Sequence, residues 1–145
     1  RSVTLLLQTY RAEFSSEPKV LLENRTGQFI STGNEMSRFW EFLSEKCPHL
    51  KSRIGIILDV QQLYTVTGKN FLKELATIPS EALEGFHIHH KHGIPDLSDE
   101  IPWKHVFDLI ANLRHKVIIN PEILHKNKVE AAIDFCEKML QGSMR

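Results

Sequence analysis

The sequence has few cysteines and no long apolar segment. Its two cysteines, Cys47 and Cys136, are too few and too widely spaced for the disulfide framework of a small secreted domain, which favours a reducing cytoplasmic location. The longest apolar runs are short, such as Ile56–Leu58, whereas a membrane-spanning helix needs about 20 apolar residues. No signal peptide is recognisable. We therefore expect a cytoplasmic protein with no membrane partner.

An excess of charge of either sign is also missing. Lys+Arg and Asp+Glu each number 18, so the formal net charge is zero with neutral histidines. Nucleic-acid-binding domains usually carry a basic excess, so nucleic acid is disfavoured as a partner. The sequence contains no Gly-rich phosphate loop, no Cys-x-x-Cys pair and no nucleophile elbow. With 41% hydrophobic and 25% charged residues, the 145 residues are expected to form one globular domain, 1–145.

Short apolar runs alternate with amphipathic segments along the chain. The apolar runs predict four buried strands, at 19–23, 53–59, 85–89 and 116–120. Helices are expected at 2–14, 32–47, 71–78, 102–113 and 126–140, and loops at 24–33, 60–68 and 90–100. Alternating strands and helices imply right-handed crossovers and a parallel sheet, and continuous apolar strands indicate a sheet covered on both faces. The fold class is therefore α/β with four parallel βα units.

A polar side chain stands near the end of each predicted strand. The four residues are spaced roughly 30 residues apart, about one βα unit each, and they are Glu23, Asp59, His87 and Glu122. The carboxyl ends of parallel strands lie on one rim of the sheet, where sites form in α/β sheets and barrels. A single acid after a strand is usually a helix cap or a solvated loop residue. Four such positions in register instead favour a shared site.

Three carboxylates and an imidazole held close together repel one another unless a cation joins them. Oxygen ligands with one nitrogen suit Mn²⁺, Mg²⁺, Co²⁺ or Zn²⁺, without selecting among these ions. Polar residues at 89–92 are further candidates for contacts at this site. His89 is expected on the same strand face as His87, whereas His90 and His92 are expected in a solvated loop. Lys91 is either an anion contact, for example to a phosphate, or a solvated surface group.

Several motifs in this order resemble a known family. They are Val20–Asn24 (VLLEN), Ile57–Gln62 (ILDVQQ), Gly85–His89 (GFHIH) and Ile101–Phe107 (IPWKHVF). The chain from about residue 20 to residue 140 resembles the later strands of the xylose-isomerase-like TIM barrels, which include sugar and sugar phosphate isomerases and epimerases and the apurinic endonucleases. In that family an Asp-Trp-Lys stretch opens the helix after strand seven, and Pro102 stands here where Asp is frequent.

The resemblance implies roles for individual residues. Epimerase-type members hold one divalent metal with Glu, Asp, His and Glu from strands five to eight, which would be Glu23, Asp59, His87 and Glu122. The two glutamates, Glu23 and Glu122, would also be the catalytic acid/base pair that moves a proton at the carbon beside a carbonyl. The family usually has a histidine three residues after the strand-six Asp, where this chain has Gln62. Gln62, His89 and Lys91 are the candidate substrate contacts.

The implied function is metal-dependent isomerisation or epimerisation of a small sugar or sugar phosphate. A metal-dependent phosphodiesterase of the endonuclease kind is the alternative, which Gln62 and the zero net charge disfavour. A non-catalytic binding module on the same scaffold is a third possibility.

The chain is too short to form a whole barrel, because a (β/α)₈ barrel needs about 250 residues. The chain would supply strands five to eight only, that is, half of a TIM barrel. Since the first residue is Arg1, we expect the C-terminal fragment of a full barrel with little turnover of its own. Open strand edges and an uncovered inner face favour association, either with an identical half-barrel in a homo-oligomer or with the missing N-terminal half-barrel.

Overall fold

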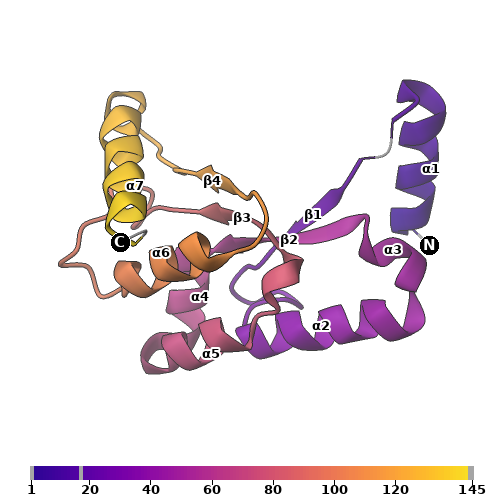
Figure 1. Cartoon of the computed structure of the whole chain (residues 1–145), viewed down its shortest axis with the longest axis horizontal. Coiled ribbons are helices and arrows are strands. Elements are labelled where there is room, and N and C mark those ends of the chain that lie inside the picture. Colours follow the sequence, from indigo (N-terminus) through magenta and orange to yellow (C-terminus); the bar gives the residue numbers. More distant parts are fainter. Residues whose placement is uncertain (1, 17, 144–145) are drawn as a thin grey trace.

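The computed structural model describes residues 2–16 and 18–143. Helices and strands alternate along the chain after a first helix (Figure 1). The helices are α1 (Ser2–Phe14), α2 (Gly33–Lys46), α3 (Pro48–Lys51), α4 (Val60–Thr67), α5 (Phe71–Thr77), α6 (Trp103–Asn112) and α7 (Val129–Ser143). The strands are β1 (Val20–Glu23), β2 (Ile54–Asp59), β3 (Leu83–His87) and β4 (Ile118–Asn120), and three short 3₁₀ turns are η1 (Gly68–Asn70), η2 (Ser80–Ala82) and η3 (Lys126–Lys128).

The four strands form one sheet in the order β1-β2-β3-β4, and every neighbouring pair is parallel. The predicted α/β class with a four-stranded parallel sheet is therefore confirmed. The register shifts between Ile56 and Ile57, where Glu84 of β3 is the extra residue of a bulge. Strand β1 pairs only with β2, and β4 only with β3, so these two strands are the edges of the sheet.

Helices cover one face of the sheet more fully than the other. The core on the covered face joins strand residues to side chains of α2, α4, α5 and α6, and includes Met36, Trp40, Ile56, Leu58, Leu63, Phe71, Phe86, Trp103 and Phe107. Figure 1 shows α2 and α5 beneath the sheet, with α1 and α7 at opposite ends of the molecule. The side chains of Trp40 and Trp103 are both buried in this core.

The expectation of a sheet covered on both faces is wrong for the edge strands. Only β2 is almost wholly buried. Strand β1 is half-buried and its last residue is exposed, and Ile118 of β4 is 61% exposed. A parallel sheet buries both faces only when other elements cover each face, and the described residues cover one.

Several predicted boundaries also change. Residues 60–67 form helix α4 instead of a loop, because Asp59 caps it by accepting a hydrogen bond from the Gln62 N–H (2.9 Å). Strand β3 spans 83–87 rather than 85–89, so His89 lies beyond it. Strand β4 begins at Ile118, two residues later than predicted. Thr32 and Glu35 form a capping box at the start of α2.

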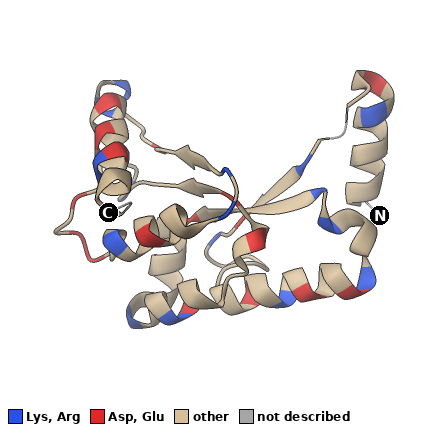
Figure 2. Cartoon of the chain, in the orientation of Figure 1, with Lys and Arg blue, Asp and Glu red and all other residues tan. Residues whose placement is uncertain are grey.

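Several apolar side chains of the helices are exposed. Leu72 of α5 and Ile133 of α7 are each 42% exposed, and the apolar side chains of α1 face solvent as well, including Leu5, Leu6, Tyr10 and Phe14. Acidic and basic side chains are interspersed along α2, whereas α7 carries mostly acidic ones (Figure 2). Among residues 2–16 and 18–143, the chain has no helix both long and apolar enough to cross a membrane.

Candidate metal centre

The four predicted ligands meet at one rim of the sheet. Glu23, Asp59 and His87 are the last residues of β1, β2 and β3, and Glu122 follows β4 by two residues. Asp59 pairs directly with His87, and Glu23 pairs with Ile57 in the same sheet register. Because side chains alternate between faces, these strand-end side chains project on the less covered side of the sheet. One potential ligand atom from each residue lies within 4.8 Å of every other.

The imidazole of His87 lies between two carboxylates. Its Nδ1 is 3.2 Å from Glu122 Oε2 and 3.7 Å from Glu23 Oε1. Nevertheless, Nδ1 is buried and makes no hydrogen bond. Buried polar atoms without a hydrogen-bond partner are rare in native proteins, and coordination of an ion is one of the explanations.

The distances from His87 Nδ1 to the two carboxylate oxygens are close to those between ligand atoms around one metal ion. Metal–nitrogen and metal–oxygen bonds of about 2.1 Å place neighbouring ligand atoms about 3.0 Å apart in an octahedron and about 3.4 Å apart in a tetrahedron. The 3.2 Å separation between His87 Nδ1 and Glu122 lies within this range, and the 3.7 Å separation from Glu23 lies slightly above it. The donor set and the unpartnered nitrogen therefore fit a divalent cation.

Asp59 is fixed in place by its neighbours. It is 2% exposed, its Oδ1 accepts the helix-cap hydrogen bond from the Gln62 N–H, and its Oδ2 lies 3.4 Å from His89 Nε2. Asn24, which is fully buried, bonds the Asp59 backbone twice: its Oδ1 accepts from the Asp59 N–H (2.7 Å) and its Nδ2 donates to the Asp59 carbonyl (3.1 Å). This amide holds the ends of β1 and β2 in register. Sequence reasoning missed it, and placed Asn24 in a polar loop.

Two of the candidate substrate residues, Gln62 and Lys91, make hydrogen bonds to neighbouring loops and helices. Gln62 Oε1 accepts hydrogen bonds from the hydroxyl (2.6 Å) and the N–H (3.2 Å) of Thr26, so this side chain joins α4 to the loop after β1. Lys91 has an exposed side chain, and its N–H donates to Gln61 Oε1 (3.1 Å). Their contacts with a substrate stay predictions.

His89 is more deeply placed than the sequence indicated. It is 1% exposed, and its Nε2 is 3.4 Å from Asp59 Oδ2 and 3.7 Å from Glu122 Oε2. His90 is also not a solvated residue: it is half-buried, and its Nδ1 is 2.6 Å from Asp99 Oδ1. The rings of His89 and His92 stack, with centroids 4.5 Å apart and planes 10° from parallel. Spacing in the sequence could not have shown that this loop folds back onto the rim.

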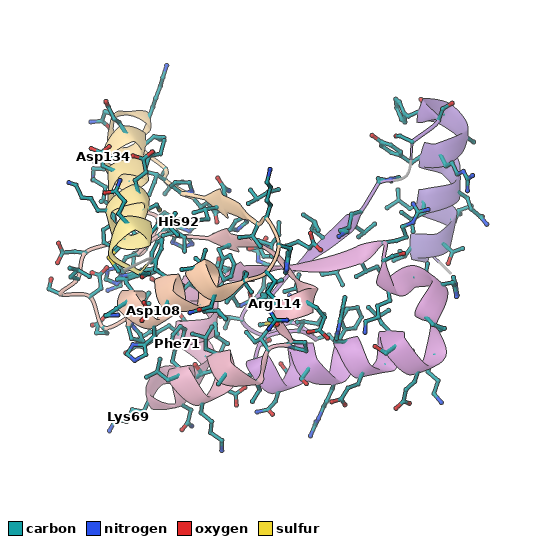
Figure 3. The ribbon with its side chains drawn as sticks, viewed as in Figure 1. Lys69, Phe71, His92, Asp108, Arg114 and Asp134 are labelled. Carbon is teal, nitrogen blue, oxygen red and sulfur yellow. The ribbon has the colours of Figure 1, made fainter. Side chains whose placement is uncertain are left out.

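A second group of potential ligands shares Glu122 with the first. It consists of His89, His92 and Glu122, again with one atom of each residue within 4.8 Å of the others. His92 Nδ1 is buried without a hydrogen-bond partner and lies 4.0 Å from Glu122 Oε1. In Figure 3, His92 lies at the end of the sheet toward which β3 and β4 run.

A hollow adjoins the centre on the less covered face of the sheet. It is lined by β2, β3 and β4, with Ile57, Gly85, His87, Ile118 and Asn120 among its walls. A Cβ atom on Gly85 would lie 3.0 Å from the Ile118 carbonyl oxygen, so this glycine allows β3 and β4 to approach closely. The hollow gives a small molecule access to His87 from the open side.

Comparisons of the chain with protein-family models and with curated proteins give no match. The site is therefore interpreted from its residues and their geometry.

Proposed function

We propose that this rim holds one divalent metal ion through four ligands, Glu23, Asp59, His87 and Glu122. We further propose that the chain is the C-terminal half of a (β/α)₈ barrel of the xylose-isomerase-like kind, acting as a metal-dependent isomerase or epimerase on a small sugar or sugar phosphate. The observation that carries the metal site is the convergence of these ligand atoms around a buried, unpartnered nitrogen, His87 Nδ1.

The strand order supports the half-barrel. In a doubly wound sheet the order reverses at a switch point, and helices then cover both faces. Here the order β1-β2-β3-β4 never reverses. Right-handed crossovers therefore place successive helices on the same side, as in the wall of a barrel. The open face, with Ile118 61% exposed, corresponds to the interior that the first four strands would enclose.

The chemistry follows from the two glutamates. Bound at this rim, a divalent ion would polarise a carbonyl or hydroxyl group and acidify the neighbouring C–H. Glu23 ends one edge strand and Glu122 follows the other, and an oxygen of each lies within 3.7 Å of His87 Nδ1. One carboxylate removes a proton from the carbon beside the carbonyl, and the other returns a proton to that carbon or to its neighbour. The substrate thereby isomerises or inverts with no net gain or loss of atoms.

Metal titration by calorimetry tests the site, with Co²⁺ and Zn²⁺ as probes. Asp59→Asn is a sharp variant because Asn caps a helix as well as Asp does, so the change removes the ligand charge and keeps the cap. Glu23→Gln removes the second carboxylate with little change in shape. We expect each to weaken affinity by more than about 100-fold, since even outer-sphere changes cost about 10- to 100-fold. Glu45→Gln, on the exposed side of α2, is the matched control. Wild-type affinity in both ligand variants would show that the site is wrong.

The reaction is tested on a complete barrel, formed by this chain together with the strands that cover its open face. Deuterium from solvent should enter the carbon beside the carbonyl of a small ketose or ketose phosphate in a metal-dependent manner, and Glu122→Gln should abolish the exchange. Cleavage of a duplex with an abasic site would instead support the phosphodiesterase. Metal binding without either reaction would support a non-catalytic binding module.

A further inference from the structure

His89 occupies an unusual position for a histidine. It is among the largest fully buried side chains of the described residues. Its Nε2 faces two of the proposed ligands, Asp59 Oδ2 at 3.4 Å and Glu122 Oε2 at 3.7 Å. It therefore stands between a carboxylate from β2 and one that follows β4, although it is not one of the four ligand residues.

A backbone hydrogen bond specifies which nitrogen of His89 carries the hydrogen. The N–H of His92 donates to His89 Nδ1 (3.1 Å). A ring nitrogen that accepts a hydrogen bond carries no hydrogen, and in a neutral imidazole the other nitrogen is then the N–H donor. His89 is thus the Nε2–H tautomer, and its hydrogen points toward Asp59 and Glu122. An ion bound at Nε2 would require this hydrogen to leave.

The turn that supplies this hydrogen bond is strained. His90 and Gly93 close it with two backbone hydrogen bonds (3.1 and 2.8 Å). Its two central residues, Lys91 and His92, have φ angles of +51° and +55°. Positive φ at both central positions is the arrangement of a type I′ turn, which favours Asn-Gly over residues with long or branched side chains. Strained backbone of this kind persists where surrounding contacts hold it and often accompanies a functional site.

We infer that His89 is a positioning residue, whose Nε2–H group holds the Asp59 and Glu122 carboxylates toward a single ion. The inference rests on the proposed metal site. Outer-sphere groups that bond ligating carboxylates orient them and tune affinity. The same tautomer removes His89 from the second ligand group, which leaves His92 and Glu122 there. The centre is therefore mononuclear, and the second group of potential ligands does not form a separate site.

Two measurements on wild-type protein test this directly. Calorimetry with Zn²⁺ should give one ion per chain. In the Zn²⁺-loaded protein, long-range ¹H–¹⁵N spectra of the histidine rings should show the Nε2–H tautomer for His89 and a metal-bound Nδ1 for His87. The spectra require no variant, so they decide the tautomer even if substitutions at this buried position unfold the chain.

Variants then separate positioning from simple packing. His89→Leu keeps the volume and removes the donor, and we expect Zn²⁺ affinity to fall about 10- to 100-fold. His89→Gln places an amide N–H near the former Nε2 and should restore most of the affinity, which a packing role would not predict. His92→Gly keeps the backbone N–H that fixes the tautomer, so affinity should match wild type. His105→Gln, at an exposed position of α6, is the control.

The outcomes distinguish this inference from the proposed function. If the wild type binds no ion, the metal site fails and the role of His89 fails with it. If the wild type binds one ion and His89→Leu binds it equally well, only the positioning role is overturned. Two ions per chain, reduced to one by His92→Gly, would also overturn it, because His92 would then be a ligand of a second ion.

Discussion

Replacing Asn24 with alanine should destabilise the fold and loosen the metal centre together. Asn24 is fully buried and continues the pairing of β1 and β2 beyond Glu23, because its amide bonds both the N–H and the carbonyl of Asp59. Alanine removes both bonds and leaves the buried Asp59 N–H without its partner. The carbonyl is less affected, since an N-cap carbonyl also accepts the first hydrogen bond of its helix.

The expected loss in the free energy of unfolding follows from the two hydrogen bonds of Asn24. A buried donor without a partner costs about 1–3 kcal/mol, and the second bond contributes about 0.5–1.5 kcal/mol. We expect Asn24→Ala to lower the free energy of unfolding by about 2–4 kcal/mol, measured by urea denaturation with an unchanged slope. The exposed Asn127 provides the control Asn127→Ala, for which a change within about 0.5 kcal/mol is expected.

The Zn²⁺ affinity of the same variant tests whether Asn24 also supports the metal centre. Asn24 fixes the end of β2 against β1, so its loss frees Glu23 and Asp59 to move relative to one another. Zn²⁺ affinity measured well below the unfolding midpoint should fall by about tenfold or more, in the range of outer-sphere changes. A loss of stability below about 0.5 kcal/mol would refute the hydrogen-bond argument. Full stability loss with unchanged affinity would refute the link to the metal centre alone.

Two further predictions concern packing and burial. Gly33→Ala should destabilise severely, because its Cβ would lie 1.9 Å from the Glu74 carbonyl oxygen, whereas Gly142→Ala in α7 meets nothing within 4 Å and should be neutral or stabilising by up to about 1 kcal/mol in thermal unfolding. Burial raises the pKa of the Cys136 thiol to about 11, so the thiol stays protonated at pH 8. A maleimide reagent should therefore label the half-buried Cys47 first and reach Cys136 only after unfolding, and equal labelling rates at pH 8 would contradict the burial.

The rim residues were predictable because they depend on chain order alone. Glu23 and Asp59 close apolar runs and His87 lies near the end of a third, and parallel strands bring such positions to one edge whatever the details of packing. The structure places all three at strand ends and brings Glu122 to them. The apolar periodicity of 32–47 and 102–113 likewise predicted the helices α2 and α6.

What sequence reasoning missed depends on single side-chain hydrogen bonds. The segment 60–67 lacks a strong helical signal, and Asp59 begins this helix while also serving the rim. Asn24 looks like an ordinary loop residue until its amide meets the Asp59 backbone. His89 was expected within the third strand, but β3 ends at residue 87, and the turn that follows His89, with two positive φ angles, brings the His92 N–H back to its Nδ1. None of these contacts has a periodic pattern by which it could be predicted.

Because one face of the sheet is open, metal binding and substrate turnover should have different structural requirements. All four proposed ligands, and the groups that orient them, come from β1 to β4 and the loops that follow them. The hollow beside His87 has walls on the sheet side only, with Ile118 61% exposed. Orientation of a substrate requires contacts from several sides, whereas coordination of an ion requires the ligands alone. Metal affinity should therefore be a property of this chain by itself, and turnover should appear only when other strands close the space above the rim.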